Sequence, residues 1–416
     1  LFSFQGALFA SKYIIRGGKK EKMKEKIEQY FGITKSGSTF KRELTGGLTA
    51  YLAMSYVIFV NPIILGQAGM PQDAVFMSTI ISSAIAMLIM GLWARFPLGL
   101  APCMSMNAFF AYSVVLQMGK TWQEALASVL VASILFLILA LSGVRSKIIQ
   151  AIPVTVKQAG TVGLGIFIAF VSFKNSGIIV PDEGMFITFG AFFLVRKNQY
   201  AVFLGMIGAA ICGLFIRFGA SMDWFHLSET VVAGLPQLPA GSPIVIPVEP
   251  MQSMLNDTFL VAVQNLDKML SLDSVVVILT FLFLDFFGTA TTLSAAATQV
   301  SDIKSEKFED NKRIYSADAL GTLFGSLFGT SSLSTYIESV SGIIAGARTG
   351  LMSVVVAILF LMSAFFYPLL SLVTAAVTTP AMIVIGIFMM QNITKIRWDG
   401  GFEEIIPAFL TIVMMP

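Results

Sequence analysis

Long apolar segments constrain this chain more than any other feature of its sequence. Segments such as Ser128–Ser142 and Leu351–Tyr367 are separated only by short polar stretches. Hydrophobic residues make up 56% of the chain and charged residues 12%, whereas a soluble domain has roughly 45–50% and about 25%. Water cannot solvate that much apolar surface, but ~20 apolar residues in a helix cross a bilayer core of ~30 Å. The sequence therefore predicts an all-α polytopic membrane protein.

Twelve spans fit the apolar segments, and a thirteenth begins near Ile405 and is cut at Pro416. Gly184–Val195 is short for a bilayer crossing, and Asn61-Pro62 is expected to mark a helix end rather than a ligand contact. The predicted spans are Leu44–Gly66, Ala74–Trp93, Pro97–Gln117, Gln123–Ser142, Gly160–Phe173, Gly184–Val195, Ala201–Phe218, Ser274–Ala297, Ile314–Phe328, Ser331–Ala345, Leu351–Leu370 and Val373–Gln391.

The basic residues predict the orientation of these spans. If the N-terminus is cytoplasmic and each span crosses once, all but four of the 27 Lys and Arg residues lie on the cytoplasmic side. The loop Gly219–Asp257, which would face outward, contains no Lys or Arg. We therefore expect a multi-pass protein of the plasma membrane with a cytoplasmic N-terminus. The exceptions are Lys120, Lys174, Arg217 and Lys268.

Several classes of function have no support in the sequence. The net charge of +3 is too small to indicate a nucleic-acid partner. Two cysteines without metal-ligand spacing and a single histidine predict no metal site. There is no phosphate-binding loop and no catalytic triad, so neither an enzyme nor a cofactor is expected.

Two carboxylates within apolar spans are the strongest candidates for a site. Asp285 lies in the middle of one span, and Glu338 lies among serines and threonines in another. Charged residues are costly to bury in a membrane and usually mark a substrate or ion pathway. The alternative is a carboxylate that only packs helices together through neighbouring hydroxyl groups.

Two spans are interrupted by residues that break helices. Gly325–Thr335 is too small and polar for a continuous lipid-facing helix, and it predicts a helix end near Gly329 and a half-helix from about Ser334. The span Pro97–Gln117 opens with Pro97 and Pro102. Matching breaks seven spans apart are typical of an inverted repeat with a binding site between its halves.

The polar residues at these breaks suit a flat polar heterocycle. A carboxylate accepts two parallel N–H bonds from such a ring, and Asn107 offers both a donor and an acceptor. The face of Phe109 or Phe110 stacks on the ring, unless these side chains only fill the span. The predicted binding residues are Glu338, Asp285, Asn107, Phe109, Ser334 and Thr335.

At these residues the chain resembles the AzgA-like branch of the nucleobase–cation symporter family, the purine permeases. The resemblance extends from about Tyr30 to Pro416. The stretches that carry it are Glu43–Pro62, Met106–Tyr112, Gly165–Phe170, Phe283–Thr289, Gly329–Ser339, Gly346–Gly350 and Ile406–Pro416.

The resemblance implies a fourteen-span fold of two inverted seven-span repeats, with the last spans truncated here. A core domain would carry the purine, and a gate domain would lie against the membrane or a second protomer in a homodimer. The implied division is a cytoplasmic segment at 1–43, core at 44–142, gate at 143–218, an extracellular loop at 219–257, core at 258–370 and gate at 371–416.

The resemblance also implies that Asp285 and Glu338 are the binding carboxylates and Asn107 a polar contact. The function it predicts is import of guanine, hypoxanthine and adenine by proton symport. Burial disfavours the charged form of a carboxylate, so a proton would neutralise Asp285 while Glu338 holds the purine, and both carboxylates are assigned to proton coupling. The alternatives are a transporter of the same fold for a pyrimidine or an anion, and an uncoupled channel or receptor.

Overall fold

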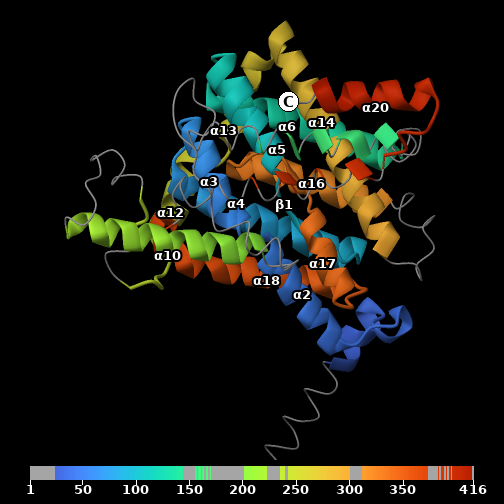
Figure 1. Ribbon diagram of the computed structural model, residues 1–416, viewed down its shortest axis with the longest axis horizontal. Helices are drawn as coiled ribbons and strands as arrows, with labels where there is room; N and C mark the ends of the chain where they lie inside the picture. The colour runs from blue at the N-terminus through green and yellow to red at the C-terminus, as the bar shows by residue number, and fades with distance from the viewer. Residues whose placement is uncertain are drawn as a thin grey trace, which may run out of the picture.

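The computed structural model describes residues 24–143, 201–222, 235–238, 242–299, 312–372 and 396–414, with scattered residues between 155 and 169 and between 383 and 394. Helices dominate this part of the chain (Figure 1). In the first half they are η1 (Thr34–Ser36), α2 (Phe40–Met54), α3 (Val57–Gln67), α4 (Gln72–Leu88), η2 (Ile89–Ala94), α5 (Met104–Ala108), η3 (Phe109–Gln117), α6 (Trp122–Ser142) and α10 (Ala201–Ser221).

The second half contains the helices that complete the bundle and two further peripheral segments. The helices are α12 (Val248–Ser253), η4 (Met254–Thr258), α13 (Val261–Gln264), η5 (Leu266–Leu270), α14 (Leu272–Gln299), α16 (Lys312–Phe328), η6 (Ile337–Ser339), α17 (Val340–Ile344), α18 (Leu351–Ser363), η7 (Ala364–Leu372) and α20 (Phe402–Met414). The strands among the described residues are β1 (Leu100–Pro102) and β2 (Leu333–Thr335).

Among the described residues, five helical segments are long and apolar enough to cross a membrane. Four of them agree with predicted spans to within about four residues, and Leu272–Ala290 overlaps the predicted Ser274–Ala297. A sixth apolar helix, α10, lies in the predicted seventh span. The predicted span Gly184–Val195 lies outside the described residues. The five segments are Phe40–Gln67, Gln72–Ala94, Trp122–Ser142, Leu272–Ala290 and Leu351–Leu372.

The ends of the long helices follow local sequence signals. The hydroxyl of Thr39 accepts a hydrogen bond from the backbone N–H of Arg42 and caps the start of α2. Thr121 and Glu124 form a reciprocal capping box at the start of α6. Gly143 ends α6 with a φ of 76°, a left-handed conformation that glycine adopts without steric cost.

Both predicted interruptions are present, and they meet in the middle of the bundle. Strand β1 of the third predicted span pairs antiparallel with β2 of the tenth, with Ala101 opposite Ser334. The backbone N–H of Cys103 donates to Ser332 O at 3.0 Å, which extends the pairing by one residue. Prolines cannot continue a helix here, and the pairing satisfies backbone groups that lipid could not.

The structure corrects two details of the predicted breaks. After β2 the chain turns into η6, so the half-helix begins at Ile337 and not near Ser334. Asn61-Pro62 does not end a helix, because both residues lie inside α3 and Asn61 is fully buried. Helix α2 ends earlier, at Met54, and Ser55 and Tyr56 connect it to α3 with helical backbone angles.

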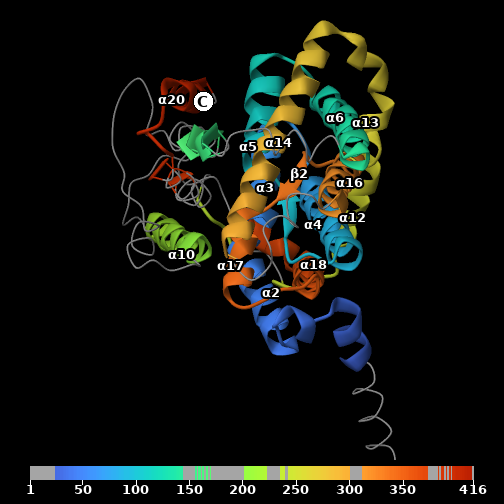
Figure 2. The same ribbon diagram turned by 90° about the vertical axis from the view of Figure 1, so that its right-hand side faces the viewer.

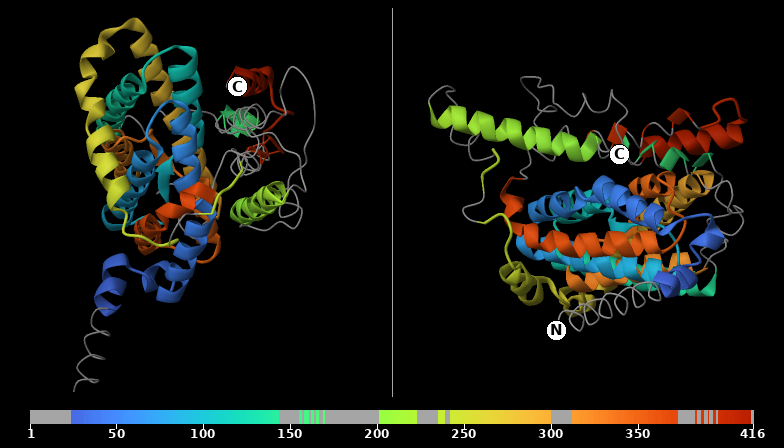
Figure 3. Two further views of the ribbon diagram at one scale, coloured as in Figure 1. Left: turned by 90° about the vertical axis from the view of Figure 1, so that its left-hand side faces the viewer. Right: turned by 90° about the horizontal axis from the view of Figure 1, so that it is seen from below.

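Strand β2 lies between α14 and α16, which contact it from either side (Figure 2). Helix α16 also packs against α6 and α4, and α18 packs against α4 and α2. Helices α10 and α20 both lie on one side of this bundle, outside it (Figure 3). Gly386 lies close to Gly165: a Cβ atom at Gly386 would be 2.7 Å from the Gly165 carbonyl oxygen.

Glycine permits the close approach of α2 to α17. A Cβ atom at Gly46 would lie 2.6 Å from Ala347 Cβ and 2.7 Å from the carbonyl oxygen of Gly342. Small residues at such crossings let membrane helices approach until their backbones touch.

We expect Gly46→Leu to destabilise the protein by about 1–3 kcal/mol, because the backbone of α17 would have to move. Thermal unfolding of the purified protein in detergent measures this as a lowered Tm. Gly208→Leu is the matched control, since a Cβ at Gly208 meets nothing within 4 Å. Equal melting temperatures of the two variants would contradict the packing described here.

Candidate functional site

Hydroxyl groups from the flanking helices hold β2 in place. Thr292 of α14 donates to the carbonyl oxygen of Thr335 at 3.0 Å, and Thr322 of α16 donates to that of Leu333 at 2.5 Å. Ser334 lies on the α14 side, with its Oγ 3.3 Å from Thr289 Oγ1. The predicted site residues Ser334 and Thr335 therefore lie in a strand whose position two helices determine.

Asp285 is buried beside a second carboxylate, Asp318, that the sequence analysis overlooked. Asp285 on α14 is 1% exposed and Asp318 on α16 is 0% exposed. Thr289 donates to Asp318 Oδ2 at 2.7 Å, and the same hydroxyl lies 3.4 Å from Asp285 Oδ1. Two buried carboxylates from different helices thus approach the same hydroxyl group.

Asp318 could have been found by the criterion that selected Asp285. It lies within the predicted span Ile314–Phe328, where a carboxylate is as costly as in any other apolar span. Only the tertiary structure shows that the two carboxylates share Thr289, since they are on different helices.

Glu338 occupies a different environment. It lies in η6, immediately after β2, and its side chain is half-buried. The hydroxyl of Tyr56, at the break between α2 and α3, donates to Glu338 Oε1 at 3.0 Å. The structure therefore separates the two predicted carboxylates into a half-buried one with a phenol donor and a fully buried one with a carboxylate neighbour.

Asn107 is fully buried in a network of polar side chains. Its Nδ2 donates to Asn61 Oδ1 at 2.6 Å, and the Ser331 hydroxyl donates to its Oδ1. Asn61 in turn donates from Nδ2 to Thr79 Oγ1 at 2.6 Å and to Thr330 Oγ1 at 2.8 Å. Both polar atoms of the Asn107 amide are thus bonded within the protein, and the network joins α3, α4, α5 and the segment before β2.

The remaining predicted contacts lie near α14 and β2. Phe109 is partly buried and packs edge-on against Phe281, with 5.1 Å between the ring centroids. Phe281 lies on α14, one helical turn before Asp285. Phe110, the other candidate for stacking, is 0% exposed. The hydroxyl of Thr335 is buried and has no hydrogen-bond partner among the described residues, so it is available to a ligand.

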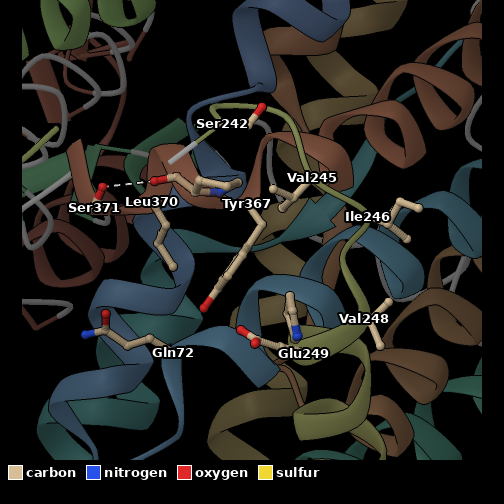
Figure 4. A pocket seen from close by; sticks show the side chains of 11 residues that line it. Gln72, Ser242, Val245, Ile246, Val248, Glu249, Tyr367, Leu370 and Ser371 are labelled. Atoms are coloured by element: carbon tan, nitrogen blue, oxygen red, sulfur yellow. Dashed lines mark hydrogen bonds between the residues drawn. The ribbon is translucent and has the colours of Figure 1, made fainter. Parts of the chain in front are cut away.

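No group of three or more His, Cys, Asp or Glu side chains in the described part of the chain is arranged to hold a metal ion. A pocket of about 790 Å³ lies elsewhere, between α4, α12 and η7 (Figure 4). The Tyr367 side chain extends there between Gln72 and Glu249. None of the six predicted site residues lines this pocket.

Comparison with known sequences gives a consistent result. The profile of the Permease family, Xan_ur_permease, matches residues 41–415. Permease MJ0326 of Methanocaldococcus jannaschii is 40% identical, over 94% of this chain and 88% of that protein. Guanine/hypoxanthine permease PbuG of Bacillus subtilis is 38% identical, over 94% and 89%. Adenine permease AdeQ of Escherichia coli is 34% identical, over 94% and 86%.

Solved structures resemble the fold at low sequence identity. The transmembrane domain of the cyanobacterial bicarbonate transporter BicA gives a TM-score of 0.54 at 17% identity, over 90% of this chain and 96% of that one. SLC26A9 gives 0.56 at 14% identity, over 95% and 66%. The chain thus has the predicted fold of two inverted seven-span repeats, while the number of spans stays a prediction.

We expect Asn61→Ala to lower the melting temperature and the rate of uptake, because it removes the partner of the buried Asn107 amide at roughly 1–3 kcal/mol. Thermal unfolding in detergent and uptake into proteoliposomes measure the two effects. Asn265→Ala is the control, since that amide, between α13 and η5, bonds only the nearby Val261 carbonyl oxygen and Lys268 among the contacts described. An Asn61→Ala protein as stable as the control would contradict a structural role for the network.

Proposed function

Because the chain belongs to the Permease family, we propose that it is a secondary active transporter that imports purine nucleobases by proton symport. Two similar proteins are named guanine/hypoxanthine permease and adenine permease, which supports guanine and hypoxanthine as substrates and adenine as a further one. The distribution of basic residues favours a multi-pass protein of the plasma membrane with a cytoplasmic N-terminus.

The strongest support for a nucleobase is the place of Glu338. It follows the paired strands directly, and one of its oxygens is oriented by the Tyr56 hydroxyl. A carboxylate accepts two N–H bonds from adjacent donors of a purine, and the buried hydroxyl of Thr335 adds a further polar contact. Phe109, at the start of η3 after β1, would pack on the purine ring. An anionic substrate would meet negatively charged carboxylates here rather than positively charged side chains.

Asn107 would act differently from the expectation based on sequence. Its amide oxygen and nitrogen are bonded to Ser331 and Asn61, so we assign it first to holding the two interrupted spans together. A direct contact with the purine would use the second N–H of the amide.

Asp285 and Asp318 are the proposed proton site. A proton entering from outside would be held between the two buried carboxylates through Thr289. The lowered negative charge of the pair would let the core, residues 44–142 and 258–370, move against the gate, residues 143–218 and 371–416. The proton and the purine would then leave to the cytoplasm. The gate would face lipid or a second copy of the chain.

We expect Glu338→Gln to weaken hypoxanthine binding at least about tenfold, because an amide replaces one charged acceptor with a donor. Uptake of radiolabelled hypoxanthine into proteoliposomes with an inward proton gradient measures the loss. Glu249→Gln, an identical change at an exposed carboxylate outside the site, should transport like the wild type. Undiminished uptake by Glu338→Gln would refute the assignment.

We expect Asp285→Asn to uncouple transport from the proton gradient, since an amide cannot take up and release a proton. Accumulation of hypoxanthine against its gradient should fall to the equilibrium level, while exchange of labelled for unlabelled hypoxanthine continues. Asp273→Asn, in the first turn of the same helix, is the control. Gradient-driven accumulation that equals that of the control would exclude Asp285 from the coupling site.

A further inference from the structure

We infer that Tyr56 is a positioning residue for Glu338, and that it determines the selectivity for ligands that offer N–H donors. This inference rests on the proposed function, because it concerns the recognition of the substrate by Glu338. Its basis is the hydrogen bond of 3.0 Å from the Tyr56 hydroxyl to Glu338 Oε1.

Tyr56 lies at the junction between two helices of the first span. Helix α2 ends at Met54 and α3 begins at Val57, so Tyr56 lies in the short connection between them. Its side chain is 1% exposed, and its hydroxyl contacts Glu338 in η6.

Tyr336 restricts the movement of the Tyr56 ring. The two rings lie 6.4 Å apart between centroids, at an angle of 50°. Tyr336 is itself held, because its hydroxyl donates to the Pro102 carbonyl oxygen at 2.7 Å. Tyr56 is therefore packed against a residue that is attached to β1, and its hydroxyl has a defined position relative to the paired strands.

The hydroxyl has a chemical consequence for Glu338. The Tyr56 hydroxyl fixes the orientation of the carboxylate, and an ionised carboxylate only accepts hydrogen bonds. Tyr56 uses one lone pair of Oε1, and a carboxylate has further lone pairs that can accept N–H bonds from a ligand. Glu338 thus presents acceptors and no donor, so it selects rings with N–H groups at the position that meets it.

The same bond separates the tasks of the carboxylates. Asp285 and Asp318 share the hydroxyl of Thr289, whereas Glu338 receives the hydroxyl of Tyr56. Tyr56 therefore acts on the substrate carboxylate alone and touches neither member of the proposed coupling pair.

The test compares the wild type with Tyr56→Phe and Tyr51→Phe. Tyr51 is the matched control, because it lies on α2 and its hydroxyl bonds Ser363 rather than a site residue, at 2.8 Å. Dissociation constants are measured on the purified full chain by displacement of radiolabelled hypoxanthine. The ligands are hypoxanthine and its forms methylated at N1, which removes the N1–H, or at N7 or N9, each of which removes the imidazole N–H.

In the wild type, the methylation that costs the most affinity identifies the N–H that meets Glu338. Tyr56→Phe should weaken hypoxanthine binding about tenfold. It should also reduce, by about the same factor, the loss of affinity that this one methylation causes. The penalties for the other methylations should not change, and Tyr51→Phe should match the wild type throughout. A general structural defect would instead weaken all ligands equally.

The outcomes are distinct. Unchanged hypoxanthine affinity in Tyr56→Phe overturns the inference, and so does an equal loss for every ligand. Melting temperatures of the two phenylalanine variants show whether the protein is intact, and a collapse of Tyr56→Phe alone assigns the residue to stability and overturns the inference as well. A wild type that binds no purine overturns the proposed function, and the inference with it.

Discussion

The antiparallel pairing of β1 with β2 is the interaction on which the site depends. Two spans are interrupted at the same depth, and a bilayer offers no water to the backbone groups that each interruption exposes. The backbone groups of β1 and β2 pair with one another, with Leu100 opposite Thr335 and Pro102 opposite Leu333. A single interrupted span would leave these groups without partners, so the two breaks stabilise each other only as a pair.

Buried hydroxyl and amide groups then connect this pair to the surrounding helices. Thr292 and Thr322 bond the carbonyl oxygens of β2 from opposite sides, and Asn61 and Asn107 link the first and third spans to the residues that precede β2. Buried polar groups are costly when they lack partners, so a network of this kind favours one arrangement of the helices over others. The position of Glu338 follows, because its segment continues directly from β2.

The local partners of each carboxylate give them different properties within one fold. Glu338 has the hydroxyl of Tyr56, whereas Asp285 and Asp318 compete for the hydroxyl of Thr289. A donor favours charge and a neighbouring carboxylate opposes it. This contrast gives a physical basis for separating substrate recognition from proton coupling in the proposed function.

The sequence by itself determined the membrane class, the positions of the spans that the described apolar helices match and both interruptions, and it selected Asp285 and Glu338 as candidates. Each of these depends on local composition: apolar length, prolines, glycines, or a carboxylate where charge is costly. Only the tertiary structure decided that Asp318 adjoins Asp285, that Asn61 bonds Asn107, and that Tyr56 reaches Glu338. Tyr56 and Glu338 are 282 residues apart, and their contact depends on how α2, α3 and η6 pack in space, which no periodicity within one segment encodes.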